Sequence, residues 1–351
     1  MKIKLNEKHT ISKNDRPYII AEIGSNHNGD MDIARNLIDA AKESGADCVK
    51  FQSWSKETVF SKKNYDDNHF LDDDYRERDD YTLEEIVEEY SISENELLDM
   101  KKYANSIGID CTSTPFSRSE VDFLVDKMQA DFIKVASMDL NNYPFLDYIA
   151  RKQKPIVLST GLSSLSEIDT AIRTIEEAGN DQIIILHCVA IYPTKDVDVN
   201  LRNIDTLSTL YPYPIGFSDH TLGTYISLAA VAKGACLIEK HFTLDKEMEG
   251  WDHKISASPD DMKAIVEASR RVHEALGNPR VSRIENKERL ESFRRSIVSA
   301  KDINKGDVIT EKMIDFKRPG TGLPPESINY IIGKKANRNI AYDEIINFED
   351  F

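Results

Sequence analysis

Eight short apolar runs recur along most of the chain, and this repetition constrains the fold more than any other feature. Each run has the length of a buried β-strand, and most intervals contain a segment with helical periodicity. Eight alternating units over about 260 residues predict a TIM (β/α)8 barrel. The expected strands are 18–23, 48–52, 109–112, 132–135, 155–159, 183–188, 215–218 and 237–241. The expected helices are 31–44, 83–107, 119–128, 142–151, 164–178, 201–210, 224–233 and 259–276.

A side chain suited to binding or catalysis stands at the end of every expected strand. In a closed barrel the carboxyl ends of all strands surround one mouth, so residues far apart in sequence converge there. The sequence therefore predicts a polar site at that mouth. Its candidates are Glu22, Lys50, Gln52, Thr112, Thr114, Lys134, Ser137, Ser159, Thr160, His187, Ser218, His220, Glu239 and His241.

Two histidines end neighbouring strands of one β-α-β unit, within the segments 215–221 and 237–242. Parallel strands end at the same edge of a sheet, so His220 and His241 are expected side by side. Two imidazoles are suited to a divalent metal that takes its other ligands from solvent or substrate. The alternative is a pair of neutral, hydrogen-bonded histidines at strand ends.

Two lysines interrupt apolar strands, Lys50 in Val49–Phe51 and Lys134 in Ile133–Val135. Two ammonium groups surrounded by hydroxyls form a site for a small, highly charged anion such as a phosphate bearing a carboxylate. The alternative places both lysines on the surface. Glu22 ends the first strand, where burial would raise its pKa towards that of a useful acid or base; the alternative is a structural carboxylate.

The formal net charge of -16 argues against nucleic acid or an anionic membrane as a partner, because these bind basic surfaces. An anionic substrate must therefore be held by a few local cations. The first 16 residues lack the apolar core of a signal peptide and no stretch is apolar enough to span a bilayer, so a cytoplasmic protein is expected. The four cysteines lie in or beside expected strands without CxxC spacing, which indicates reduced core residues.

Three segments lie outside the repeated strand and helix units. The acidic loop 53–81 is long enough to cover the mouth as a lid, with a merely solvated loop as the alternative. Residues 1–277 are expected to form the barrel, 278–291 a charged linker, and 292–351 a small domain. A domain of that size is marginal by itself and is expected to dock on another surface.

Nine motifs, in order from about Pro17 to the end, together resemble the N-acetylneuraminate (sialic acid) synthase family. They are AEIGSNHNG at Ala21, VKFQ at Val49, STPFSR at Ser113, IKVAS at Ile133, STG at Ser159, IYPT at Ile191, GFSDHT at Gly216, EKHF at Glu239 and KRPG at Lys317. The ordered set is far more specific than any one of its members. The resemblance implies a TIM barrel with a C-terminal antifreeze-like (SAF) domain. It also implies condensation of phosphoenolpyruvate with a hexosamine-derived aldose to give a nine-carbon α-keto acid and phosphate.

The resemblance also implies roles for individual residues. His220 and His241 would be the protein ligands of a divalent metal, expected to be Mn²⁺ with Mg²⁺ or Co²⁺ as alternatives, and Glu22 would be an acid or base. The phosphoenolpyruvate site would comprise Lys50, Thr114, Lys134, Ser137, Ser159 and Ser218. The sugar site would comprise Gln52, Asp139, Tyr192 and Asp252, with Arg318 contributed by the swapped SAF domain of a homodimer.

Two departures from the family pattern lie on the sugar side. After the fourth-strand lysine, sialic acid synthases show the pattern Gly-Ser-Gly-Glu, whereas this chain has Ala136-Ser137-Met138-Asp139. Near the eighth strand they show Gly-Pro-Asp, whereas this chain has Gly250-Trp251-Asp252. The acceptor is therefore N-acetylmannosamine or a deoxy, diacylated relative. Other readings are a phosphoenolpyruvate-dependent synthase making an eight-carbon ulosonate, a metal-dependent pyruvate aldolase, and a non-catalytic sugar-binding module.

Overall fold

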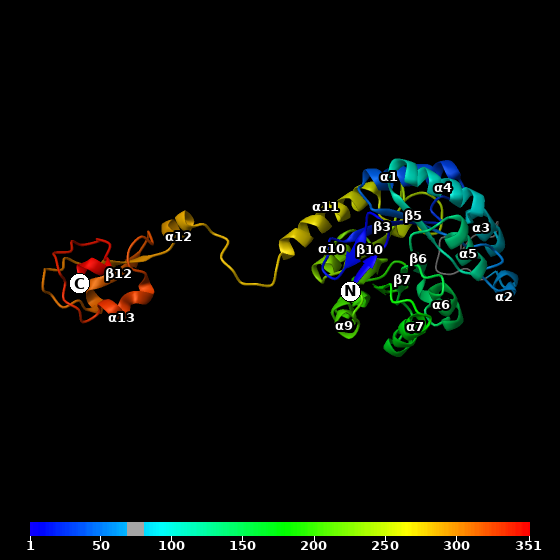
Figure 1. Ribbon diagram of the computed structural model, residues 1–351. Helices are drawn as coiled ribbons and strands as arrows, with labels where there is room; N and C mark the ends of the chain where they lie inside the picture. The colour runs from blue at the N-terminus through cyan, green and yellow to red at the C-terminus, as the bar shows by residue number, and fades with distance from the viewer. Residues whose placement is uncertain (69–80) are drawn as a thin grey trace. The chain divides into compact units, whose positions relative to one another are not determined.

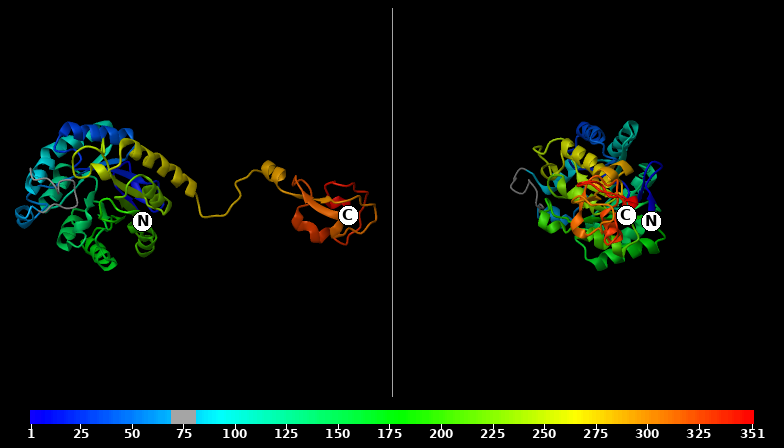
Figure 2. Two further views of the ribbon diagram at one scale, coloured as in Figure 1. Left: turned by 180° about the vertical axis from the view of Figure 1, so that it is seen from behind. Right: turned by 90° about the vertical axis from the view of Figure 1, so that its left-hand side faces the viewer.

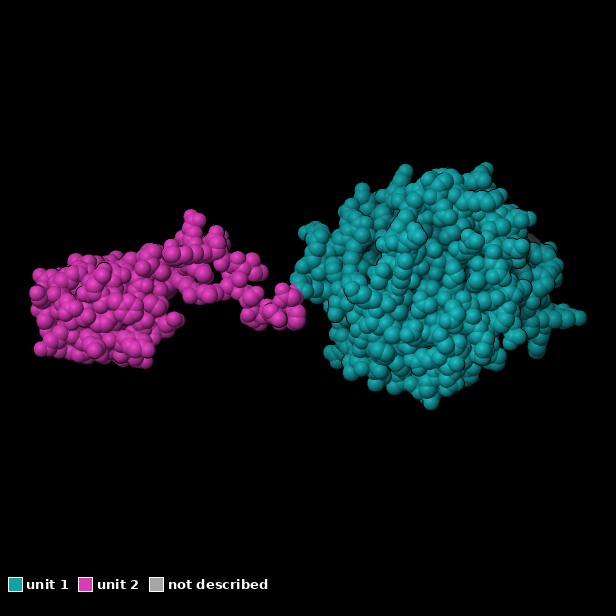
Figure 3. Space-filling model, viewed as in Figure 1, with its two compact units in different colours: residues 1–277 teal, residues 278–351 magenta. Residues whose placement is uncertain are grey.

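The computed structural model describes residues 1–68 and 81–351, and it divides the chain into two compact units. The first unit is Met1–Gly277 and the second is Asn278–Phe351 (Figure 3). Each is described separately below. Of the expected lid, residues 69–80 lie outside the described residues, and the described part includes the short helix α2, Lys62–Asp66.

The first unit is a nearly closed eight-stranded parallel barrel, which confirms the predicted fold class (Figure 1). Its strands run in the order β5-β4-β3-β10-β9-β8-β7-β6. At the seam between β5 and β6 the described residues form no strand ladder, but the Thr112 hydroxyl donates to the Phe132 carbonyl at 2.9 Å. The strands are β3 Tyr18–Gly24, β4 Cys48–Gln52, β5 Asp110–Thr114, β6 Ile133–Val135, β7 Ile156–Ser159, β8 Ile183–Cys188, β9 Ile215–Asp219 and β10 Leu237–His241.

Helices surround these strands on the outside of the first unit (Figure 2). Many of them begin at a capping box, for example Ser164 with Glu167 and Ser258 with Asp261, where each side chain bonds to the other residue's backbone N–H. The helices are α1 Met31–Glu43, α3 Leu83–Tyr90, α4 Glu94–Ile107, α5 Arg118–Asp122, α6 Tyr143–Ala150, α7 Leu165–Glu177, α8 Asp196–Val199, α9 Arg202–Leu210, α10 Tyr225–Ala232 and α11 Pro259–Leu276.

Two local predictions were wrong. The expected helix 83–107 is two helices, because Ser93 caps a new helix and forms a capping box with Glu96. The expected helix 119–128 is the short α5 followed by a π-helical turn, η1, at Phe123–Lys127. The N-terminal segment, for which the sequence analysis made no secondary-structure prediction, forms a hairpin of β1 Lys2–Lys4 and β2 Thr10–Ser12.

Side chains alternate along each barrel strand between two cores. Ile19 and Ala21 of β3 pack outward against the helices, whereas Ile20 belongs to a smaller core inside the barrel. That inner core includes Cys48, Phe132, Val157, Ile184 and Leu237, together with Ile3, Leu5 and Ile11 from the N-terminal segment. The inward positions are therefore apolar at the amino ends of the strands and polar at the carboxyl ends. The four cysteines are buried and free.

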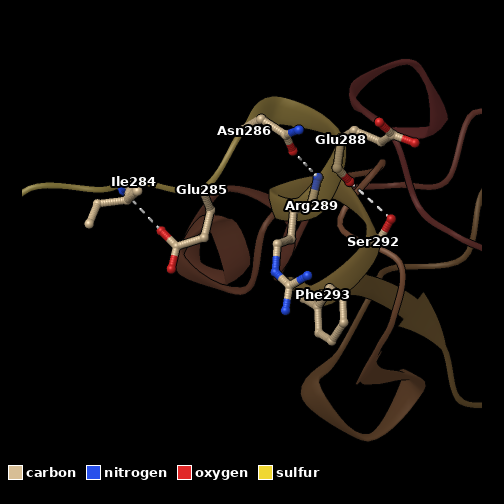
Figure 4. A pocket seen from close by; sticks show the side chains of 7 residues that line it. All are labelled: Ile284, Glu285, Asn286, Glu288, Arg289, Ser292 and Phe293. Carbon is tan, nitrogen blue, oxygen red and sulfur yellow. Dashed lines mark hydrogen bonds between the residues drawn. The ribbon is translucent and has the colours of Figure 1, made fainter. Parts of the chain in front are cut away.

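The second unit has its own small apolar core, which includes Ile297, Ile309 and Ile346. Its elements are α12 Lys287–Phe293, an antiparallel pair of β11 Ser296–Ser299 and β12 Ile314–Lys317, and α13 Ile328–Ile331. A hollow of about 750 Å³ lies along α12 and contains none of the residues predicted for the polar site (Figure 4). In the described part of the chain, no helix is both long and apolar enough to cross a membrane.

Candidate active site

The carboxyl ends of the strands bring most of the predicted residues together. In the sheet register Glu22 of β3 lies opposite Lys50 on one side and His241 on the other. Ser218 of β9 lies opposite Glu239 of β10. Buried polar residues at this end are Glu22, Lys50, Thr114, Lys134, Ser159, Ser218, His220, Glu239 and His241, each no more than 7% exposed. The interior of the barrel mouth is therefore a buried polar cluster.

Two lysines and two glutamates form the centre of this cluster. Lys50 Nζ lies 2.5 Å from Glu22 Oε2 and 3.9 Å from Glu239 Oε2, and it donates to the Thr114 hydroxyl at 2.7 Å. Lys134 Nζ lies 3.3 Å from Glu239 Oε1. Each buried ammonium therefore has a carboxylate partner, which offsets the cost of removing its charge from water. An anionic ligand would have to compete with these carboxylates for the lysines.

The two glutamates differ in their electrostatic environment. Burial raises the pKa of Glu22 to about 7, although Lys50 opposes that shift. Burial would also raise the pKa of Glu239, but Lys134 and Lys50 outweigh it and lower the pKa to about 2. Glu239 is therefore a permanent anion between two cations, whereas Glu22 exchanges its proton near neutral pH.

Glu239 is a central residue of the site to which the sequence analysis assigned no role. Its neighbour Lys240 points to the other face of the strand, where its Nζ lies 3.0 Å from Asp219 Oδ2 and donates to the Thr221 carbonyl at 2.7 Å. Strand parity was the available signal, because Glu239 and His241 are two residues apart and share the inward face. The Ser218 hydroxyl donates to Glu239 Oε1 at 3.2 Å.

The two imidazoles lie near one another, with ring centroids 5.6 Å apart. His220 Nδ1 is 2.8 Å from the Val189 carbonyl, so Nδ1 carries a proton and donates it to that carbonyl. His241 Nδ1 is buried, makes no hydrogen bond within the described chain, and lies 3.5 Å from Asp252 Oδ2. Burial and the nearby His220 lower the pKa of His241 well below its usual value, which keeps that ring neutral.

This donor set fits a divalent metal. Both rings have a nitrogen suited to coordination, and a carbonyl bonded to the far nitrogen of a ligating imidazole is the usual second-shell arrangement. The described residues contain no group of three or more His, Cys, Asp or Glu side chains placed to hold a metal. A metal here would therefore take its remaining ligands from water or substrate.

The predicted sugar residues are only partly brought together. The Gln52 amide donates to Glu22 Oε1 at 3.0 Å, and the Tyr192 ring lies 4.2 Å from that of His220. The side chains of Glu22, Gln52 and Asp252 approach one another near Gly24. A Cβ there would lie 3.4 Å from Gln52 Nε2, 3.4 Å from Glu22 Oε1 and 3.6 Å from Asp252 Oδ2. Its φ of +55° also favours glycine.

Asp139 and Arg318 were also predicted for the sugar site. Asp139 lies in a 3-10 turn at Ser137–Asp139 and accepts from the Asn142 amide at 3.1 Å. Arg318 belongs to the second unit, where its guanidinium lies 5.0 Å from the centre of the Phe293 ring. Their predicted contacts with a sugar stay predictions.

The remaining hydroxyls occupy distinct places at the mouth. Ser137 Oγ accepts from the Gly161 N–H at 3.0 Å, and a Cβ at Gly161 would come within 2.7 Å of that oxygen. Ser159 Oγ is buried and has no hydrogen-bond partner within the described chain. A buried hydroxyl without a partner costs free energy, so Ser159 is suited to bonding a ligand.

The fold and the site define the class of protein: a barrel with buried lysines and an imidazole pair at its mouth, in a chain that also has a small β unit. The chain belongs to the NeuB family, whose sequence pattern matches residues 37–281, and the SAF domain pattern matches residues 294–351. The family predicted from the motifs is therefore confirmed.

Relatives resemble the chain over nearly its full length. It is 37% identical to the N,N'-diacetyllegionaminic acid synthase of Legionella pneumophila, over 92% of this chain and 91% of that protein. It is 35% identical to the N-acetylneuraminate-9-phosphate synthase of Homo sapiens, over 94% of this chain and 91% of that protein. The crystal structure of N-acetylneuraminic acid synthetase from Leptospira borgpetersenii, in complex with citrate, matches with a TM-score of 0.73 and 32% identity. That match covers 82% of this chain and 94% of the other.

Proposed function

We propose that this protein is a nonulosonic acid synthase. It would condense phosphoenolpyruvate with an N-acylated hexosamine and water, giving a nine-carbon α-keto acid and phosphate. The observation that carries the proposal is the convergence of Lys50, Lys134 and the His220–His241 pair at one barrel mouth. The relatives, which are synthases of sialic, legionaminic and pseudaminic acids, support the same reaction class.

The lysine half of the site would hold phosphoenolpyruvate. Its phosphate and carboxylate would replace the carboxylates that now face Lys50 and Lys134. The Thr114, Ser137, Ser159 and Ser218 hydroxyls would donate to the phosphate and carboxylate oxygens. Charge-assisted hydrogen bonds of this kind are the stronger ones, and several of them fix the orientation of the enol carbon.

The imidazole half of the site would receive the aldehyde. A divalent metal held by His220 and His241, expected to be Mn²⁺ with Mg²⁺ or Co²⁺ as alternatives, would supply Lewis-acid polarisation of the aldehyde oxygen. The C2=C3 electron pair of phosphoenolpyruvate forms the new bond from C3 to the aldehyde carbon, and the aldehyde oxygen gains a proton. Water adds at C2, and the C2–O bond to phosphate breaks. Glu22 would exchange a proton with the water or the aldehyde oxygen.

The acceptor would lie on the side of Gln52, Tyr192 and Asp252. The acceptor would be N-acetylmannosamine or a deoxy, diacylated relative. Asp139 and Trp251 replace residues of the sialic acid synthase pattern, and we propose that they influence the choice between these acceptors.

We also propose a homodimer in which Arg318 acts on the partner's barrel. The second unit is small, and within it the Arg318 guanidinium lies over the Phe293 ring. Loops that follow β6 to β9 expose Met138, Leu162, Ile191 and Leu222, each more than half exposed. A second copy of the chain is the partner expected to cover these apolar side chains.

Release of inorganic phosphate from phosphoenolpyruvate, measured against a panel of hexosamine acceptors with Mn²⁺, tests the function. We expect release that depends on one N-acyl hexosamine and is lost in His220→Ala and His241→Ala without unfolding. Full activity after chelation and dialysis would contradict the metal site. Release with a five-carbon acceptor, giving an eight-carbon product, would contradict the nonulosonate assignment.

A further inference from the structure

Both tryptophans of the chain, Trp54 and Trp251, lie together beside the candidate sugar residues. Their ring centroids are 5.0 Å apart, although the residues come from loops after β4 and β10. Trp54 follows Gln52 by two positions, and Trp251 immediately precedes Asp252. Both side chains are partly exposed. Gln52 and Asp252 approach each other near Gly24, so these sequence positions put the indole pair close to that side of the mouth.

Residues close to both indoles are held by hydrogen bonds. Next to Trp54, the Ser53 N–H donates to the Thr114 carbonyl at 2.9 Å, and its hydroxyl lies 2.6 Å from that of Ser113. Near Trp251, the His253 ring lies between the Thr243 hydroxyl at 2.7 Å and Asn28 Oδ1 at 3.1 Å.

Each indole has a second aromatic neighbour. Phe116 lies 6.4 Å from the Trp54 ring and Tyr90 lies 6.4 Å from the Trp251 ring. Trp54 and Trp251, called the indole wall below, therefore pack in one aromatic cluster with Phe116 and Tyr90.

One polar atom of this wall has no partner. Trp54 Nε1 is buried and makes no hydrogen bond within the described chain. An indole nitrogen only donates, and a buried donor without an acceptor is costly. The wall therefore combines apolar ring surface with one hydrogen-bond donor, which matches an acylamino group with its methyl and its carbonyl oxygen.

The rings of the wall and the imidazole rings make contacts with different residues. The imidazoles make their ring contacts with each other and with Tyr192, whereas Trp54 makes its ring contacts with Trp251 and Phe116. If the aldehyde is at the imidazoles, the substituent that reaches the indoles is remote from it. A hydroxymethyl group there would place a hydroxyl against apolar rings, whereas a methyl group would not.

We propose that Trp54 and Trp251 form a subsite for an acylamino group remote from the aldehyde, which selects a deoxy acceptor carrying a second acylamino group over N-acetylmannosamine. The Trp54 Nε1–H donates to the acyl carbonyl, and the acyl methyl and the deoxy carbon pack on the indoles. The selection of acceptor rests on the proposed synthase function, but occupation of the subsite is measurable by binding alone.

Tryptophan fluorescence is a direct probe, because these are the only two tryptophans in the sequence. The full-length protein, with Mn²⁺ and phosphoenolpyruvate, is titrated with three ligands. They are N-acetylmannosamine, a deoxy hexose with one acetamido group, and a deoxy hexose with two. We expect a saturable emission change with the diacetamido sugar, at a Kd about tenfold below that of N-acetylmannosamine. The monoacetamido deoxy sugar should lie between them. Equal or weaker binding of the diacetamido sugar would overturn the proposal.

Trp54→Phe tests the hydrogen bond alone, because it keeps an aromatic ring and removes the N–H. Trp251 still provides the fluorescence signal. The ratio of Kd values for N-acetylmannosamine and the diacetamido sugar should fall about fivefold, the scale of one hydrogen bond. Phe116→Leu is the matched control, since it loosens packing against Trp54 without removing the donor. An unchanged ratio in Trp54→Phe, or an equal fall in Phe116→Leu, would overturn the proposal. If Trp54→Phe fails to fold, Trp251→Phe is measured in its place and is expected to lower the same ratio of Kd values. An unchanged ratio in Trp251→Phe would overturn the proposal.

Phosphate release separates this proposal from the synthase function. Binding of the diacetamido sugar at the tryptophans without phosphate release from any acceptor would contradict the synthase and leave the subsite established. Efficient release with N-acetylmannosamine, together with poor binding of the diacetamido sugar, would support the synthase and contradict the subsite.

Discussion

Lys50 and Lys134 are almost fully buried, and each faces a carboxylate in the ligand-free site. Replacing either lysine with alanine removes a cation from the proposed phosphoenolpyruvate site and leaves a glutamate uncompensated. We expect the KM for phosphoenolpyruvate to rise more than about tenfold in each variant, or about 1.4 kcal/mol. The KM for the acceptor should change less.

Lys101 provides a matched control for these variants. It is a buried lysine of α4 whose Nζ donates to the Cys111 carbonyl at 2.8 Å, away from the strand ends that form the mouth. Lys101→Ala should lower the unfolding temperature without changing the KM for phosphoenolpyruvate. A larger effect on acceptor KM than on phosphoenolpyruvate KM in the Lys50 and Lys134 variants would reverse our assignment of the half-sites.

The raised pKa of Glu22 gives a prediction about pH. Above pH about 7 its carboxylate is ionised and holds Lys50, so the site gains a negative charge as pH rises. Phosphoenolpyruvate should therefore bind more weakly at pH 8 than at pH 6. Glu22→Gln should weaken this dependence several-fold, measured by calorimetric titration. The ligand's own phosphate titration, with a pKa near 6, is common to both proteins. Parallel curves for the two proteins would contradict a Glu22 carboxylate that competes with phosphoenolpyruvate for Lys50.

The sequence indicated which residues end the strands but not how their charges pair. Lys50 and Lys134 were predicted to face the mouth because a charge inside an apolar strand requires a buried partner. Choosing Glu239 as the anion between them needs distances across three strands, which no local pattern contains. The contacts of Trp54 with Trp251 depend on two loops almost two hundred residues apart, and the sequence offered no signal for that pair.

At the level of elements, alternate residues of each barrel strand share one face, so the inner core and the polar site lie on the same face of the strands. Gly216 of β9 is on the inward face with Ser218, and a Cβ there would lie 2.6 Å from both Leu186 Cδ2 and the Leu237 carbonyl oxygen. Gly216→Ala should therefore destabilise the barrel by about 1–3 kcal/mol through overpacking. Denaturant unfolding measures this. In a Leu186→Val background, which shortens one of the two obstructing groups, the same change should cost less. Equal unfolding midpoints for Gly216→Ala and the parent would show that the neighbouring strands yield freely.

Helix boundaries were less predictable than strands, for two different reasons. The break between α3 and α4 has a local cause, the capping box of Ser93 and Glu96, so its signal was present in the sequence. The π-helical turn at Phe123–Lys127 has no such signal. The N-terminal hairpin contributes Ile3, Leu5 and Ile11 to the inner core. Three apolar residues are too few to show a periodic pattern. The sequence therefore did not predict that this segment packs inside the barrel.

At the level of the whole molecule, charge is distributed unequally between the two units. Residues 278–351 contain 14 lysines and arginines and 12 aspartates and glutamates. Residues 278–351 therefore carry a formal charge of +2 and residues 1–277 a charge of -18, which together give the net charge of -16. If the acidic barrel binds phosphoenolpyruvate as proposed, it requires local cations, and we propose Arg318 of the second unit as one of them. A guanidinium can hold polar groups of a sugar in a bidentate way, which a barrel lysine cannot.

Whether Arg318 serves its own barrel or a partner's is testable by complementation. His241→Ala and Arg318→Ala chains, each expected to be inactive alone, are co-expressed and allowed to pair at random. If Arg318 acts in trans, every mixed dimer has one barrel with both intact groups. Half of the dimers are mixed, so roughly a quarter of all sites should recover activity in the phosphate-release assay. If Arg318 acts within its own chain, every site contains a lesion and activity stays at the level of the single variants. Mixing the two proteins after separate purification, under conditions that prevent subunit exchange, should give no recovery in either case. Recovery there would mean that one variant was not inactive by itself.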